Sequence, residues 1–126
     1  MNKKASEWLK QADYDIETAE FMFAGGKFFY SVFMCHLSVE KAMKGLYQEK
    51  LGETPPKTHN LVYLLKKIDV RPPELAGKFI IKLNQASVVT RYPEDIDHLQ
   101  SQFTQPVVTD ILVKSREILQ WIKEQF

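Results

Sequence analysis

The segment from Lys27 to Leu51 constrains the fold of this 126-residue chain more than any other. Its apolar and aromatic residues recur at spacings of three and four, which is the period of a helix, and they cover much of the circumference. The residues that form this surface are Phe28, Phe29, Val32, Phe33, Cys35, His36, Val39, Met43, Leu46 and Tyr47. A helix that is apolar on several sides needs neighbours on several sides. The pattern therefore predicts a helical bundle with this segment at its centre.

Narrower apolar stripes of helical period predict the surrounding helices, at about residues 4–23, 73–89 and 105–126. A shorter helix is expected to open at Thr58-His59-Asn60-Leu61, with Asn60 or Thr58 as its N-cap. Glycine and proline pairs separate these segments, and no stretch alternates with the period of a strand. We therefore predict an all-α protein, an antiparallel up-and-down bundle of four main helices plus one short helix, forming a single domain over residues 1–126.

The charge balance bounds the kinds of partner that the chain can bind. It has 17 Lys and Arg against 16 Asp and Glu, so any contact with RNA or nucleotide must come from a local patch, including one built across a dimer. The single cysteine, Cys35, excludes an intramolecular disulfide and is predicted to be a buried small hydrophobic residue. No run resembles a signal peptide or approaches the ~18 apolar residues of a membrane span. We expect a cytoplasmic protein that does not contact membranes.

The segment from Val88 to His98 departs from helical patterning and gathers reactive side chains. The guanidinium of Arg91 is planar and permanently charged and can bind a phosphate through two hydrogen bonds. His98 can accept and return a proton near neutral pH. Together they would suffice for metal-independent RNA cleavage, with the histidine as the base on the 2′-hydroxyl and the arginine on the phosphorus oxygens. The alternative is that Arg91 pairs with Glu94 or Asp95 and that His98 is a surface residue in the first turn of a helix.

Pro93 breaks this segment, because proline disfavours helical backbone at Tyr92 and cannot lie in a helix interior. We predict that Pro93 starts a new helical turn, which makes Glu94 and His98 neighbours at positions i and i+4. A carboxylate there would favour the protonated imidazole, which suits phosphate binding better than general-base catalysis. Arg91 is therefore the predicted phosphate ligand, with Tyr92 beside it for stacking or a hydrogen bond.

Other candidate groups are weaker. Lys41 and Lys44 would extend a phosphate-binding surface if they lie near Arg91, and are otherwise a solvated helix face. The acidic run Glu94, Asp95 and Asp97 could ligate magnesium, but acid-rich first turns are also common at helix starts. The three histidines lack zinc spacing and there is no glycine-rich phosphate loop, so no metal and no cofactor is expected. His36 is predicted to be a hydrogen-bonded core or interface histidine.

Four stretches in order along nearly the whole chain resemble the HEPN domain family, the helical domains named for higher eukaryotes and prokaryotes nucleotide-binding. The stretches are Trp8-Leu9-Lys10-Gln11-Ala12-Asp13-Tyr14-Asp15, His36-Leu37-Ser38-Val39-Glu40-Lys41-Ala42-Met43-Lys44, Thr58-His59-Asn60-Leu61 and Thr90-Arg91-Tyr92-Pro93. The resemblance implies a bundle of four to five helices that is usually dimeric. Many members are metal-independent RNases whose motif is an arginine, four to six residues and a histidine.

Arg91, six intervening residues and His98 match that motif at its long limit. Catalytic members usually place Asn, Asp or His directly after the arginine, whereas this chain has Tyr92 and then Pro93, which favours binding over cleavage. The resemblance also implies a possible partner, since small HEPN proteins are often encoded beside a minimal nucleotidyltransferase as a toxin–antitoxin pair. We therefore expect a homodimer that binds nucleotide or RNA phosphate at a dimer cleft and partners such an enzyme. The alternatives are an active RNase toxin using Arg91 and His98, and a non-catalytic structural dimerisation module.

Overall fold

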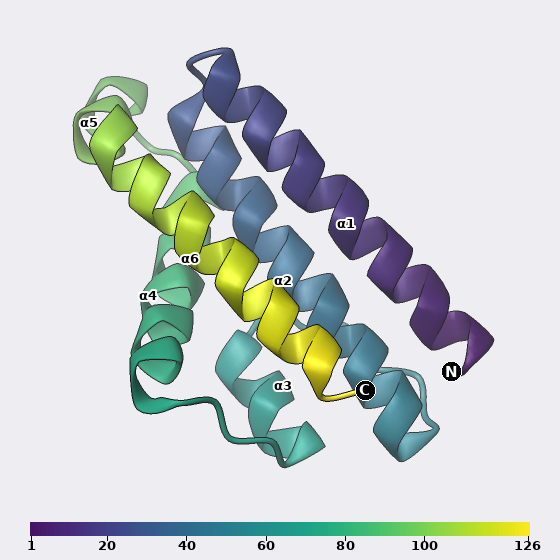
Figure 1. Cartoon of the computed structure of the whole chain (residues 1–126). Coiled ribbons are helices and arrows are strands. Elements are labelled where there is room, and N and C mark those ends of the chain that lie inside the picture. The colour runs from purple at the N-terminus through teal and green to yellow at the C-terminus, as the bar shows by residue number, and fades with distance from the viewer.

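The computed structural model of the chain describes residues 1–126 and consists of helices joined by short loops (Figure 1). The helices are α1 (Lys3–Ala24), α2 (Phe28–Leu51), α3 (Leu61–Ile68), α4 (Glu74–Arg91), α5 (Ile96–Gln102) and α6 (Gln105–Glu124). The predicted all-α bundle is confirmed. Its four long helices and the short α3 correspond to the predicted segments, and α5 is a further short helix where the sequence predicted only a helical turn starting at Pro93.

Helix α2 is the centre of the molecule, as predicted. It has 24 residues, of which 15 are buried, and it packs against α1 on one side and against α3, α4 and α6 on the others (Figure 1). Its buried side chains join those of the other helices in one continuous apolar core. A central helix needs apolar residues around most of its circumference, which is the pattern that its sequence shows.

Helices α1 and α2 pack closely because small residues face each other along their contact. Ala5, Ala12 and Ala19 recur every seven residues on α1, and Gly45, Ser38 and Ser31 do so in the opposite order on α2. The hydroxyl of Ser38 donates to the carbonyl of Ala12 at 2.7 Å, and that of Ser31 donates to Ala19 at 2.7 Å. A Cβ at Gly45 would lie 3.2 Å from the carbonyl oxygen of Ala5. The three pairs therefore fix the antiparallel register of the two helices.

The loop between α2 and α3 has defined ends. Gly52 closes α2 with a φ of 66°, a left-handed conformation that glycine adopts without steric cost. Asn60 caps α3, because its side-chain oxygen accepts a hydrogen bond from the backbone N–H of Tyr63 at 3.1 Å. The N-cap role predicted for Asn60 is thus confirmed, and a hydrogen bond from the side chain of Asn84 ties the same residue to α4.

The corner after α4 differs from its prediction. Helix α4 continues two residues further than expected, so Arg91 is its last residue, and Tyr92 is non-helical as predicted. Pro93 does not start a helix. Instead, Asp95 caps α5 by accepting from the N–H of His98 at 3.1 Å, and α5 begins only at Ile96. The prediction that Glu94 and His98 are i,i+4 helix neighbours is therefore wrong, because the Asp95 cap places Glu94 outside the helix.

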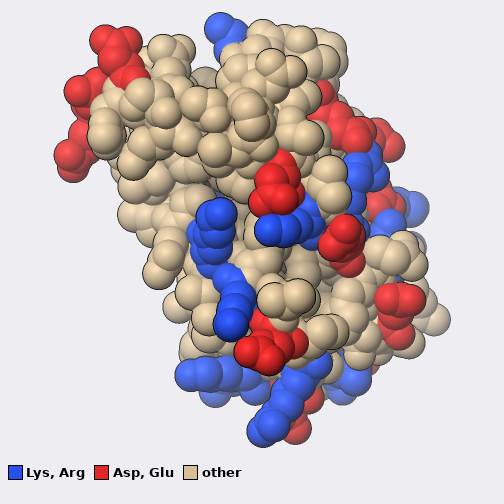
Figure 2. Space-filling view, turned by 60° about the vertical axis from the view of Figure 1, so that its left-hand side comes forward, with Lys and Arg blue, Asp and Glu red and all other residues tan.

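The surface carries no extended basic region on the face shown in Figure 2. Basic and acidic side chains lie interspersed over its lower half, and much of the upper half is uncharged.

No helix of the protein combines the length and the apolar character that crossing a bilayer requires. Cys35 is fully buried, as predicted, and burial raises the pKa of its thiol to about 12.

Candidate functional site

Arg91 ends α4 in a position that leaves its charge without a protein partner. Its guanidinium lies over the ring of Phe33 on α2, with 4.8 Å between the central carbon and the ring centroid. No carboxylate lies within ion-pair distance of it, so the alternative pairing with Glu94 or Asp95 does not occur in this structure. One terminal nitrogen, Nη2, is shielded from solvent and has no hydrogen-bond partner. The stacked ring fixes the cation and leaves its donors unused.

Arg91 lines an open cleft of about 340 Å³ between α4 and the loop that precedes α3. We call this the Arg91 cleft; its lining residues are Thr58, His59, Asn60, Asn84, Ser87, Val88, Arg91 and Tyr92. Most of these side chains are polar, and none is a carboxylate. On α4 the lining residues are spaced by three and four, so they share one face of the helix. The cleft therefore presents hydrogen-bonding groups and a positive charge, which is a combination that suits an anion.

Asn84 holds the two walls of the Arg91 cleft together. Its side-chain oxygen accepts from the backbone N–H of Leu61 at 2.9 Å, and its amide nitrogen donates to the side chain of Asn60 at 3.3 Å. The same oxygen lies 3.5 Å from Nε2 of His36. Because Asn84 and Arg91 are two turns apart on α4, this amide brings the α2–α3 loop alongside the arginine.

Next to the cleft, the buried carboxylate of Glu40 on α2 lies within 4 Å of three basic side chains, those of His36, Lys44 and His59. Only 3% of Glu40 is exposed. Its Oε2 accepts from Nζ of Lys44 at 3.1 Å, and its Oε1 lies 2.9 Å from Nδ1 of His59 and 3.9 Å from Nδ1 of His36. We call these four residues the Glu40 cluster. A buried carboxylate requires such partners, because desolvating an unpaired charge is costly.

His36 is the fully buried member of the Glu40 cluster, in agreement with the prediction of a core histidine. Burial lowers its pKa below the usual 6.5, although the charge of Glu40 and the contact with Asn84 oppose this shift. Its Nδ1 has no hydrogen-bond partner. Burial therefore favours the neutral imidazole in the folded protein, since the charged form would lose its hydration.

This shift predicts a pH dependence of stability. In the unfolded chain His36 takes up a proton as pH falls through about 6.5, whereas the folded chain resists it. The free energy of unfolding should therefore fall on going from about pH 7.5 to about pH 5.5, and it should fall less in a His36→Gln variant. Urea denaturation at both pH values measures the two differences. If the wild type and the His36→Gln variant lose the same free energy of unfolding, His36 is not the source of the pH dependence.

The other predicted site residues lie in different surroundings. Tyr92 lines the cleft and is 71% exposed, beside Arg91 as predicted. Lys41 forms an ion pair with Asp15 of α1 at 2.9 Å, and neither Lys41 nor Lys44 lines the cleft. His98 is an exposed residue in the first turn of α5, and its side chain makes no hydrogen bond within the chain. Within one chain, the structure thus brings together Arg91 and Tyr92 but not the two lysines or His98.

The acidic residues of the corner do not gather around a common point. Asp95 is used as the cap of α5, and the protein contains no group of three or more His, Cys, Asp or Glu side chains placed to hold a metal ion. Asp97 lies in the first turn of α5, where a negative charge is favoured by the helix dipole. Asp95 and Asp97 are therefore explained by the start of α5.

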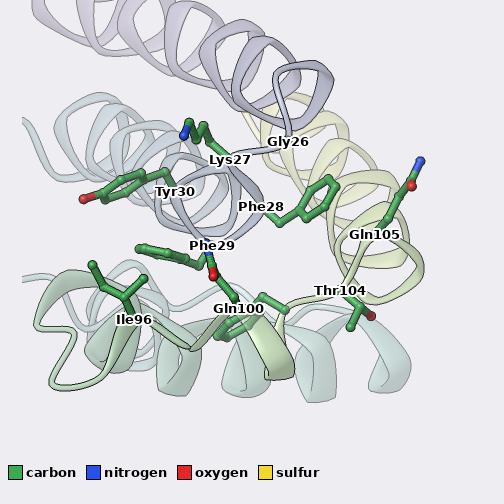
Figure 3. A pocket seen from close by; sticks show the side chains of 10 residues that line it. Gly26, Lys27, Phe28, Phe29, Tyr30, Ile96, Gln100, Thr104 and Gln105 are labelled. Atoms are coloured by element: carbon green, nitrogen blue, oxygen red, sulfur yellow. The ribbon is translucent and has the colours of Figure 1, made fainter. Parts of the chain in front are cut away.

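A second, larger cavity of about 530 Å³ lies between the start of α2 and the segment α5–α6 (Figure 3). Its walls are largely aromatic and apolar, with Phe28 and Phe29 of α2 near Ile96 and Gln100 of α5. Lys27 is its only charged lining residue, and it contains no histidine or carboxylate. It offers space for an apolar group but no set of groups for proton transfer, so the Arg91 cleft is the better candidate site.

Three residues of the site were not predicted from the sequence as functional. His59 and Glu40 lie in two of the stretches that resemble the HEPN domain family, but the sequence predicts no role in a site for either of them or for Asn84. A signal was present for Glu40, since it follows His36 by four residues on the most buried helix of the chain. A histidine and a carboxylate at that spacing on a central helix indicate a buried polar cluster. The contact of Asn84 with the α2–α3 loop depends on the packing of α3 against α4.

The fold and the candidate site define a small helical bundle with a polar cleft that contains an arginine, and the comparisons with known proteins bear on the fold. The profile of the HEPN domain matches residues 5–125, and the chain belongs to the HEPN domain family. Among solved structures it is similar to TT1696 from Thermus thermophilus, at 24% identity and a TM-score of 0.85 over 99% of this chain and 100% of that chain. It is also similar to ST0689, described as an archaeal HEPN homologue, at 26% identity and a TM-score of 0.77 over 98% of both chains. No curated protein matches the sequence.

Proposed function

We propose that this protein binds the phosphate of a nucleotide or of RNA in the Arg91 cleft. The observation that carries the proposal is the half-buried guanidinium of Arg91, which is stacked on Phe33 and has no carboxylate partner. Leaving a buried donor without an acceptor costs about 1–3 kcal/mol, and a bound phosphate would satisfy it with charge-assisted hydrogen bonds. Membership of a family linked to nucleotide and RNA binding supports the same conclusion.

The neighbouring side chains suit a ribonucleotide. Tyr92 is exposed beside the arginine and can stack on a base or donate to a phosphate oxygen. The side-chain NH₂ of Asn60 adds a donor to the same cleft, whereas the hydroxyl of Ser87 already donates to the carbonyl of Asn84. The absence of any carboxylate from the cleft lining removes the repulsion that an anion would otherwise meet there.

Replacing Arg91 tests this proposal. We expect Arg91→Ala to weaken the binding of ATP or of a short fluorescent single-stranded RNA by about 10- to 100-fold, which is the loss of one charge-assisted, bidentate contact. Arg71→Ala is a matched control, because Arg71 is an exposed arginine in the loop before α4 and does not line the cleft. Fluorescence anisotropy and calorimetry measure both affinities. Unchanged binding by Arg91→Ala would rule out the proposed role.

We further propose that the cleft is completed in a homodimer and that a minimal nucleotidyltransferase is the protein partner in a toxin–antitoxin-like pair. Exposed apolar side chains at the end of α4 and the start of α5 support an interface near this corner: Val88, which lines the cleft, is 61% exposed, Val89 is 43% exposed and Ile96 is 56% exposed. Sedimentation of the protein used in the binding experiment gives its mass at the same concentration. A monomer that binds ATP or RNA with full affinity would show that one chain suffices.

A further inference from the structure

The larger cavity, between the start of α2 and the segment α5–α6, offers flat aromatic surfaces (Figure 3). Phe29 and Tyr30 lie on one side with their ring centroids 4.6 Å apart, and Ile96 of α5 lies across from them. Phe28 and Phe103 also line the cavity. Its volume of about 530 Å³ falls in the range of small-molecule sites, roughly 300–1,000 Å³. The cavity can therefore enclose a flat aromatic group.

Two polar side chains at the edge of this cavity are free to form hydrogen bonds. Gln100 reaches from α5 toward the first turn of α2 (Figure 3), and its amide makes no hydrogen bond within the chain. Thr104 is the N-cap residue of α6, but its hydroxyl does not cap the helix. No lining residue is a carboxylate. An apolar occupant would offer these groups no hydrogen bond, whereas a nucleobase presents flat faces to the rings and donors and acceptors at its edge.

The cavity and Arg91 contact the same side of α2. The guanidinium of Arg91 lies over the ring of Phe33, 4.8 Å from its centroid. Phe33 follows Tyr30 by three residues and Phe29 by four, so the three aromatic residues share one face of α2. Neighbouring turns of a helix are only about 5.4 Å apart. A single strand of RNA can therefore place a phosphate at Arg91 and a base in the cavity at the same time.

We propose that this cavity binds an unstacked nucleobase of single-stranded RNA while Arg91 binds a phosphate of the same strand. The inference rests on the proposed function, because Arg91 anchors the strand beside the cavity. The rings of Phe29 and Tyr30 contact the face of the base, and Gln100 forms hydrogen bonds with its edge. The bases of a duplex are paired and stacked and cannot enter, so the ligand is a single strand.

Two strands of equal charge test the base site by fluorescence anisotropy: a labelled single-stranded RNA of about five nucleotides, and a strand of the same length that has no bases. The wild type should bind the base-bearing strand at least about 5-fold more tightly, the low end of what stacking of one base contributes. Tyr30→Ala should remove this preference, and so should Gln100→Trp, in which a larger side chain fills the cavity. Tyr14→Ala is the control and should keep it, because Tyr14 is an exposed tyrosine of α1 that does not line the cavity.

The results distinguish the base site from the phosphate site. Equal affinity of the wild type for both strands would overturn the base site and leave phosphate binding at Arg91 intact. A preference that survives both Tyr30→Ala and Gln100→Trp, or that only Tyr92→Ala removes, would show that the base binds outside the cavity. Arg91→Ala should weaken the binding of both strands. Two affinities unchanged by that variant, or a wild type that binds neither strand, would remove the proposed function as well. If Tyr30→Ala lowers the Tm, Gln100→Trp decides, because residue 100 is exposed.

Discussion

Glu40→Ala is expected to destabilise the protein by about 3–5 kcal/mol, the range found when one partner of a buried ion pair is removed. Glu40 and Lys44 form an i,i+4 pair in which both residues are buried, with 3% and 7% of their surface exposed. Without the carboxylate, the ammonium of Lys44 stays buried with no opposite charge, and His59 loses its anchor. Urea denaturation followed by circular dichroism measures the loss.

Asp110 and Lys114 provide a matched control for this prediction. They are also an i,i+4 pair, at 3.0 Å, but about half of each side chain is exposed. Asp110→Ala should cost no more than about 0.5 kcal/mol, since solvent screens both charges. A double variant, Glu40→Gln with Lys44→Met, should lose less than the sum of its two single variants, because no unpaired charge remains buried. Additive losses would show that the two charges do not depend on each other.

Gly45→Val should destabilise the protein by about 3 kcal/mol through overpacking between α1 and α2. A Cβ at Gly45 would lie 3.0 Å from Cβ of Trp8 and 3.2 Å from the carbonyl oxygen of Ala5. Neither atom is the free end of a flexible side chain, so the two helices must move apart to admit the valine. The hydrogen bonds from Ser31 and Ser38 to α1 lie along the same contact and would be stretched.

The control for Gly45→Val is a glycine on a helix with space around it. A Cβ at Gly77 of α4 would meet only Cγ of Pro72, at an ordinary 3.6 Å, so Gly77→Ala should stabilise by about 0.5–1 kcal/mol through helix propensity. Urea denaturation followed by circular dichroism measures both changes in stability. A Gly45→Val protein within about 1 kcal/mol of the wild type would show that the α1–α2 contact is not tightly packed.

The sequence predicted the helices well because their signals are local. The apolar surface of residues 28–51 placed α2 at the centre, Gly52 and Asn60 marked helix ends, and the order of motifs indicated the HEPN domain family. It also singled out Arg91 as a charged residue near a helix break. These features depend on helical period, on backbone conformation and on the charge of single side chains, all of which can be read without knowledge of tertiary contacts.

The corner after α4 was predicted less well, since two local preferences compete there. Proline favours the first turn of a helix, but Asp95 offers a side-chain cap, and the cap determines the start of α5. The short α5 has only seven residues, and its one buried residue is Leu99. So short a segment shows no clear helical period in its apolar residues, and the formation of α5 depends on its packing against the rest of the bundle.

What the sequence by itself determined is the all-helical bundle and its central helix, and it singled out Arg91 as the candidate phosphate ligand. Only the tertiary structure decided which residues surround Arg91. Its guanidinium lies over Phe33, Asn84 connects α4 to the α2–α3 loop, and His59, which contacts Glu40, lines the same cleft. The physical reason is that helix formation depends on residues three and four apart. A site joins side chains from helices and loops that are distant in sequence, and their meeting depends on how the helices pack.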